Sequence, residues 1–219
     1  MNPCDLTSRR VRLDGGGSAA PYPWNGEEVM VRDDALAVLE CIKLLQDEGA
    51  PPEAKAADFM PLFFADPAAA FLACDYDPRE FGRLIESAVW DVCGIDLKGD
   101  RPHERPLWDP EEDAAYIRIS FRAEYGIDWD AVRGEIGFAE FVALVGGCST
   151  ATPLGRAIHY RNPKTRPRPA KRGSNKKEIE EWDRLHRAYA LKGRSSRGER
   201  EGNDAAMRDA FAALKRAAR

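Results

Sequence analysis

Residues 108–162 read WDPEEDAAYIRISFRAEYGIDWDAVRGEIGFAEFVALVGGCSTATPLGRAIHYRN, and this is the most informative stretch of the chain. The Asp-Pro pair at 109–110 is typical of a helix start, because Asp accepts free backbone N–H groups and Pro fits the first turn. The apolar residues Ala114, Ile117, Phe121 and Tyr125 then recur at helical spacing until Gly126, a natural stop. A second helix ends at Gly146-Gly147, and Thr152-Pro153 begins a short third one. The stretch therefore predicts three helices separated by tight turns.

The same start signals recur toward the N-terminus. Asp33-Asp34 precedes one apolar helical pattern, while Asp66-Pro67 and Asp77-Pro78 precede two more. The last of these patterns, residues 81–92, is the most regular amphipathic stripe in the chain, and Gly94 is a natural stop after it. A further helix is expected over 53–64, where an internal Pro61 predicts a break.

Residues 1–32 have a different pattern. Val11 and Leu13, and later Val29 and Val31, alternate with polar residues as strands do. A glycine-rich and proline-rich segment separates them, so we predict a small hairpin or arm. The fold class expected for the whole chain is mainly α with this small N-terminal β element.

The C-terminal part is basic. Residues 1–160 carry 15 Lys+Arg against 29 Asp+Glu, whereas residues 161–219 carry 18 against 8, within a total net charge of −4. Residues 163–174 are rich in Pro and Arg and predict an extended linker, followed by a helix over about 175–192 and a short last helix from Asn203. We therefore expect four parts: 1–32, a helical domain over 33–162, the linker 163–174 and a basic helical tail over 175–219.

The composition also indicates a compartment. The five cysteines are scattered without the two-residue spacing of a zinc knuckle, which favours free thiols in a reducing environment. No apolar run approaches the roughly 20 residues needed to span a bilayer, and the N-terminus has no apolar signal region. We expect a cytoplasmic protein that does not bind membranes.

Residues that could support catalysis are sparse. The three histidines, His103, His159 and His186, do not share a metal-ligand spacing. The carboxylates of residues 111–113 occupy the predicted first turn of a helix, where the helix dipole favours negative charge. The glycines at 15–17 lack the Lys-Ser/Thr of a phosphate-binding loop. We predict a protein that is not an enzyme, with no catalytic residue, no metal and no cofactor.

Two features of the tail suggest an interaction. A dense basic run is compatible with a solvated linker, an acidic protein partner or nucleic acid. The apolar stripe of the tail helix either packs back on the chain or enters a groove on a partner. The basic patch consists of Arg161, Lys164, Arg166, Arg168, Lys171, Arg172, Lys176 and Lys177.

The order of features in 108–162 resembles the bacteriophage gene-product-fifteen family, and the wider similarity covers roughly residues 20–192. Residues 138–139 are Phe-Ala where the family usually has paired tryptophans, the segment 15–23 is an unusual insertion and the helix after residue 203 is extra. The resemblance is carried by Trp108-Asp109, Tyr116-Ile117, Phe121, Glu124–Asp128, Phe138–Gly147, Thr152–Gly155, Ile158 and Arg161.

The resemblance implies a prophage protein that acts as a tail assembly chaperone in the bacterial host cell. Such a protein would bind the tape measure protein, keep it soluble until the major tail protein displaces the chaperone, and associate with itself. The alternative is a nucleic-acid-binding phage accessory protein that acts through the basic tail. Partner contacts are expected at Phe138, Phe141, Trp182, Leu185 and Tyr189.

Overall fold

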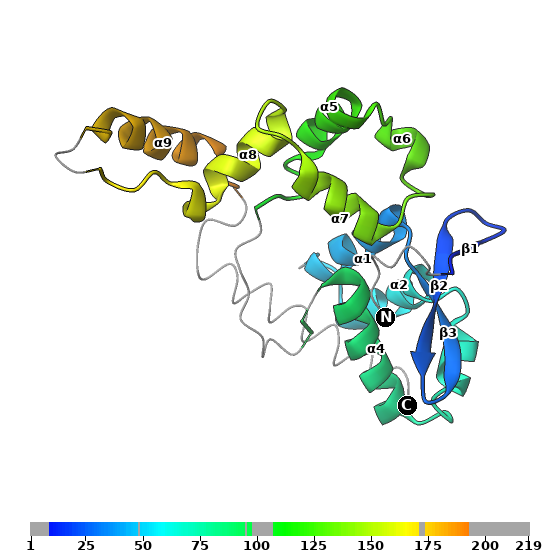
Figure 1. Ribbon diagram of the computed structural model, residues 1–219. Helices are drawn as coiled ribbons and strands as arrows, with labels where there is room; N and C mark the ends of the chain where they lie inside the picture. The colour runs from blue at the N-terminus through cyan, green and yellow to red at the C-terminus, as the bar shows by residue number, and fades with distance from the viewer. Residues whose placement is uncertain (1–8, 48, 95, 98–106, 171–173, 193–219) are drawn as a thin grey trace. The chain divides into compact units, whose positions relative to one another are not determined.

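The computed structural model describes residues 9–47, 49–94, 96–97, 107–170 and 174–192 (Figure 1). These residues form nine α-helices, one 3-10 turn and a three-stranded sheet, which confirms the prediction of a mainly α fold with a small N-terminal β element. Two compact units are present. The described part of unit 1 consists of residues up to 97 and 131–142, and that of unit 2 of 107–130 and 143–192.

The sheet of unit 1 is antiparallel, with strands β1 (Val11–Arg12), β2 (Ser18–Trp24) and β3 (Glu27–Arg32) in that order. Strand β2 was not predicted, because it contains Pro21 and Pro23, which cannot donate to a β-ladder. Both prolines lie beyond Ser18 and Ala19, the residues with which β1 pairs, so this part of β2 has an open side.

Four helices follow the sheet: α1 (Ala35–Gln46), α2 (Pro52–Phe63), α3 (Pro67–Leu72) and α4 (Pro78–Cys93). The predicted caps are confirmed at three of them. The Asp34 carboxylate accepts the Ala37 N–H at 2.9 Å, and Asp66 and Asp77 act in the same way at α3 and α4. The break predicted at Pro61 was wrong, because α2 continues to Phe63 and contains the proline in its last turn.

Phenylalanines fill the interior of unit 1. Phe59 and Phe63 stack with their ring centroids 5.0 Å apart, and Phe64 contacts both Phe63 and Phe81. The segment 131–142 joins this core, since the Ala35 N–H donates to the Ile136 carbonyl at 2.9 Å and the Phe138 N–H to the Asp33 carbonyl at 2.8 Å. Apolar burial is therefore what holds unit 1 together.

In the second half of the chain come α5 (Ala114–Tyr125), α6 (Trp129–Val132), α7 (Phe138–Gly147), α8 (Pro153–Arg161), the 3-10 turn η1 (Pro163–Thr165) and α9 (Lys176–Tyr189). Gly126 ends α5 in the left-handed conformation, as predicted. The predicted start at 109–110 was wrong by several residues. The Asp109 carboxylate instead accepts the Glu111 and Glu112 N–H groups, which makes a turn ahead of the helix.

The helix predicted from Asn203 lies outside the described residues, as does His103. Among the helices that the structure describes, none combines the length and the apolar character needed to cross a bilayer.

Candidate interaction surface

A buried ion pair occupies the centre of unit 2. Arg161, at the end of α8, donates from Nη1 and Nη2 to the two carboxylate oxygens of Asp113, at 2.5 and 2.9 Å. The same guanidinium donates to the Leu107 carbonyl at 3.1 Å and to the Tyr189 carbonyl at 2.6 Å. The side chains are only 9% and 1% exposed. One arginine thus joins the segment before α5, the start of α5 and the end of α9.

Helix α9 packs against α8 around a single indole. Trp182 is 5% exposed, and its ring lies 6.5 Å from that of Tyr160 and stacks on His186 at 4.8 Å. Tyr160 also stacks on Tyr189, with ring centroids 5.7 Å apart. The His186 Nδ1 atom lies 2.6 Å from the Tyr160 carbonyl oxygen. The apolar stripe of the tail helix could either pack back on the chain or enter a groove on a partner. In the structure the stripe packs on α8 of its own chain.

The exposed apolar side chains of unit 2 lie elsewhere, on the outer face of α5. Ile119 is 54% exposed and Tyr116 is 36% exposed. They are three residues apart, so they share a face of the helix, and Ala123 continues that face one turn later. Large apolar side chains at neighbouring exposed positions are typical of a surface that binds another protein.

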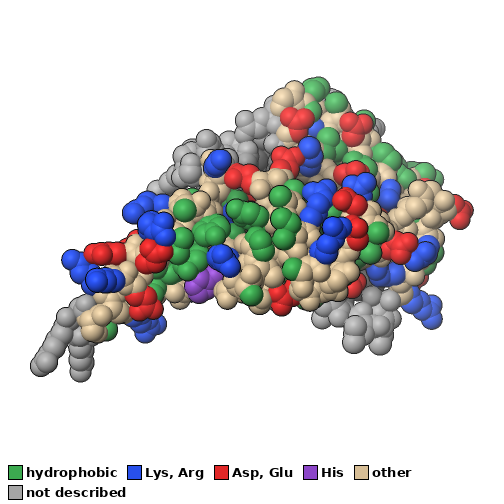
Figure 2. All heavy atoms as spheres, turned by 90° about the horizontal axis from the view of Figure 1, so that it is seen from above, with side chains coloured by type: hydrophobic (Ala, Val, Ile, Leu, Met, Phe, Trp, Pro, Cys, Tyr) green, Lys and Arg blue, Asp and Glu red, His purple; other side chains and the backbone are tan. Residues whose placement is uncertain are grey.

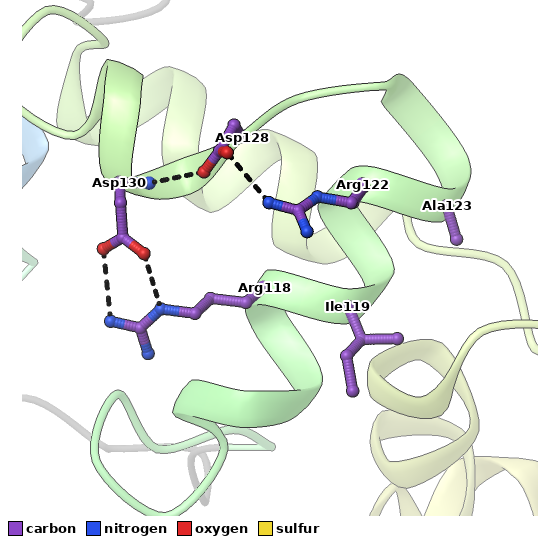
Figure 3. A pocket seen from close by; sticks show the side chains of 6 residues that line it. All are labelled: Arg118, Ile119, Arg122, Ala123, Asp128 and Asp130. Carbon is purple, nitrogen blue, oxygen red and sulfur yellow. Dashed lines mark hydrogen bonds and ion pairs between the residues drawn. The ribbon is translucent and has the colours of Figure 1, made fainter.

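A hollow of about 520 Å³ borders this face (Figure 3). Ile119 and Ala123 provide its apolar lining, with two arginines of α5 beside them and two aspartates, one just before α6 and one within it. The hollow is lined by Arg118, Ile119, Arg122, Ala123, Asp128 and Asp130.

Two ion pairs fix the charged rim of the hollow. Arg118 donates to both carboxylate oxygens of Asp130 at 3.2 and 3.3 Å, and Arg122 donates to Asp128 at 2.8 Å. All four side chains are about half exposed or more, so each pair contributes at most about 1 kcal/mol to stability. Their main effect is to place charges of both signs around an apolar patch.

The sequence of this chain matches the bacteriophage Gp15 protein family over residues 21–191. The chain belongs to this family. No curated protein and no solved structure matches it. The matched range covers the described helices of both units and extends through α9, so the packing of α9 on α8 lies within the region that defines the family.

Three of the aromatic contacts expected of this Gp15 protein are interior residues. Phe138 and Phe141 are 7% and 0% exposed and stack on each other in unit 1, and Trp182 is buried against α8. They cannot touch a partner in this conformation. Leu185 and Tyr189 are half-buried on α9.

The basic patch of the Gp15 protein is also partly neutralised. Arg161 is buried against Asp113, Arg166 is paired with Asp183 at 2.7 Å, and Lys176 lies 3.7 Å from Glu180. The remaining described members, Lys164, Arg168 and Lys177, are exposed, while Lys171 and Arg172 lie outside the described residues. In Figure 2, acidic and basic side chains alternate over α9, so its surface is of mixed charge.

Sequence reasoning missed the α5 face for an identifiable reason. The apolar stripe of α5 was assigned to Ala114, Ile117, Phe121 and Tyr125, of which Ile117 and Phe121 are buried as expected. Tyr116 and Ile119 fall outside that stripe, which is itself a signal, because large apolar residues on the polar face of a helix have no core to enter. Within the described residues, no group of three or more His, Cys, Asp or Glu side chains is arranged to hold a metal ion.

Proposed function

We propose that this Gp15-family protein is a non-enzymatic tail assembly chaperone that binds the phage tape measure protein and keeps it soluble during tail assembly. The observation that carries the proposal is the apolar face of α5, with Ile119 at 54% and Tyr116 at 36% exposure in a protein of a phage family. A long helical protein with apolar stripes is the kind of partner that such a face fits.

The proposed mechanism is shielding. An apolar residue of the partner helix enters the hollow beside Ile119, while polar residues next to it meet the Arg118–Asp130 and Arg122–Asp128 pairs at the rim. Burial of apolar area contributes about 25 cal/mol per Å², and a patch of two large side chains is small, so each copy binds weakly. Many copies along one partner would give a stable coat through multivalency. Displacement by the major tail protein then needs to break only weak individual contacts.

The first test is co-expression with the longest helical protein encoded beside the gene. We expect a large soluble complex by size exclusion with light scattering, and an insoluble partner when that protein is expressed alone. A soluble monomer beside a still insoluble partner would reject the proposal.

The second test addresses the surface. Changing Tyr116→Gln and Ile119→Gln together removes the apolar contacts but keeps good helix formers, so recovery of the partner should fall at least about tenfold, a change of roughly 1.4 kcal/mol. Leu72→Gln is the matched control, because Leu72 is 55% exposed in unit 1 and lies outside the proposed surface. Both proteins should keep their melting temperature. Equal recovery with the double variant and the control would reject the α5 face as the contact surface.

A further inference from the structure

The segment that leads into α9 is bonded to α9 itself. Arg166 donates from Nε and Nη2 to the Asp183 carboxylate at 2.7 and 2.8 Å. The Asn175 side chain accepts the Ala170 N–H and donates to the Arg168 carbonyl, both at 2.9 Å. Residues 166–170 and α9 therefore form one hairpin, whose own contacts do not depend on the rest of unit 2.

The hairpin is joined to α8 at a single place. The turn η1, Pro163–Thr165, connects Arg161 and Asn162 to the hairpin, and proline fixes its first residue. A change of direction in this short turn would move the hairpin as one body. Identical chains can exchange an element that is joined to the rest of its chain by such a turn.

The contacts of α9 with the rest of unit 2 are few and localised. Of its fourteen residues, Trp182 is the one that is buried. The other contacts are the Tyr189 ring and carbonyl with Tyr160 and Arg161, and His186 with the Tyr160 carbonyl. Beyond α9, the Lys192 N–H donates to the Glu112 carboxylate at 2.9 Å. Every one of these contacts can form equally well when the hairpin comes from another copy.

We propose that α9 packs not only on α8 of its own chain but also on α8 of a second copy, by exchange of the hairpin at residues 163–165. The occupant of the α8 surface is then the α9 of a neighbouring chain, with its Trp182 beside Tyr160 and its Tyr189 carbonyl on Arg161. The short linker gives α9 an effective concentration in the millimolar range at α8 of its own chain. Packing on a second copy therefore competes when the concentration of the protein itself reaches this range. Reciprocal exchange between two copies gives a closed dimer, whereas exchange from each copy to the next gives an open row where the rotation between copies does not close. A row along the tape measure protein rests on the proposed function, whereas the exchange itself does not.

Two full-length variants with complementary defects test the exchange. Trp182→Ser damages the helix but leaves the α8 surface intact, and Tyr160→Ser damages the α8 surface but leaves the helix intact. Neither variant can dock α9 in its own chain or in a copy of itself. In a mixture, the α9 of the Tyr160→Ser chain can dock on α8 of the Trp182→Ser chain. As the protein concentration is raised to about 1 mM, we expect the light-scattering mass of the mixture to rise from that of a monomer toward that of a 1:1 dimer. This range matches the effective concentration that a short linker gives within one chain.

Three controls complete the design. Each variant alone should stay monomeric, and so should the double variant Trp182→Ser with Tyr160→Ser. In a matched mixture, a Tyr76→Ser chain replaces the Tyr160→Ser chain. Tyr76 is 61% exposed in unit 1, so its loss leaves α9 packed on α8 of its own chain, and this mixture should stay monomeric. A mixture of the two complementary variants that stays monomeric over the whole range would overturn the proposal.

A measurement on the unmodified protein covers the case in which a variant does not fold. Chains labelled with ¹⁴N and ¹⁵N are mixed at high concentration and treated with a carbodiimide, which couples lysine ε-amines to nearby carboxylates. The Lys192 backbone N–H lies 2.9 Å from the Glu112 carboxylate, so the flexible Lys192 side chain is expected to reach that carboxylate and be coupled to it. Exchange predicts a cross-linked peptide pair of mixed isotope that increases with concentration. A cross-link found only within one isotope would overturn the proposal, whatever the result with the tape measure protein.

Discussion

Helices α4 and α9 have equally regular apolar stripes but very different surroundings. Seven of the sixteen residues of α4 are buried, whereas α9 buries Trp182 among fourteen. Helix α4 packs on α1 and α3 within unit 1, while α9 packs on α8. The apolar stripe of a helix thus predicts the face that turns inward, but the amount of burial depends on how many neighbours surround it.

The two helices are also held by different forces. The stripe of α4 is closed by apolar contact, with Leu84, Ile85 and Val89 fully buried. Helix α9 is held by one indole, by the stack of Tyr189 on Tyr160 and by polar contacts to Tyr160 and Arg161. Substitutions in unit 1 should therefore lower stability through lost apolar packing, and substitutions around α9 through lost polar contacts. Three measurements test this difference.

The largest effect is expected from loss of the buried Arg161–Asp113 ion pair of unit 2. Arg161→Met removes the partner of Asp113, whose side chain is 1% exposed, and leaves a buried charge that still accepts the Asp109 N–H. The free energy of unfolding of unit 2 should fall by about 3–5 kcal/mol, measured by urea unfolding with circular dichroism. Adding Asp113→Asn removes the unpaired charge and should recover much of the loss. Unchanged stability in the single variant would show that the ion pair does not hold unit 2 together.

The next effect is a loss of apolar packing in unit 1. Leu84→Ala empties space in a fully buried site on α4 and should lower the free energy of unfolding by about 2–5 kcal/mol. Leu185→Ala, at the half-buried edge of α9, should cost less than about 1 kcal/mol. Thermal and urea unfolding of the pair measure the difference. Equal losses would mean that α9 is as firmly packed as α4.

The smallest effect follows from the thiols of unit 1. Burial raises the pKa of Cys41 to about 12 and that of Cys74 to about 11, against an ordinary value of about 8.5. Both groups are protonated in the folded and the unfolded chain at neutral pH, and only the unfolded chain releases its protons as the pH rises above about 8.5. The free energy of unfolding should therefore fall by about 1 kcal/mol or more per thiol between pH 8.5 and 10, in reductant. Cys41→Ala with Cys74→Ala should flatten this fall, and an equally steep fall without the thiols would contradict it.

Local rules accounted for much of the fold. The Asp-Pro starts at α3 and α4, the Thr152 cap of α8 and the glycine stops after α4 and α5 were all predicted, because each depends on a few neighbouring residues. The start of α5 was not, because Asp113 is bound by an arginine 48 residues away. Strand β2 was missed because its prolines argue against a strand until the open side of the sheet is known.

The mainly α class and the amphipathic faces could be predicted from the chain alone, because they follow from periodicity and capping. The membership in a phage family rests on the match of residues 21–191 to that family. The tertiary structure alone decided which of those faces are covered. It buried Trp182 against Tyr160, enclosed Arg161 with Asp113 and left Tyr116 and Ile119 exposed on α5. The reason is physical. Helix formation depends on residues three and four apart, whereas burial depends on which surfaces the chain brings together over long sequence distances.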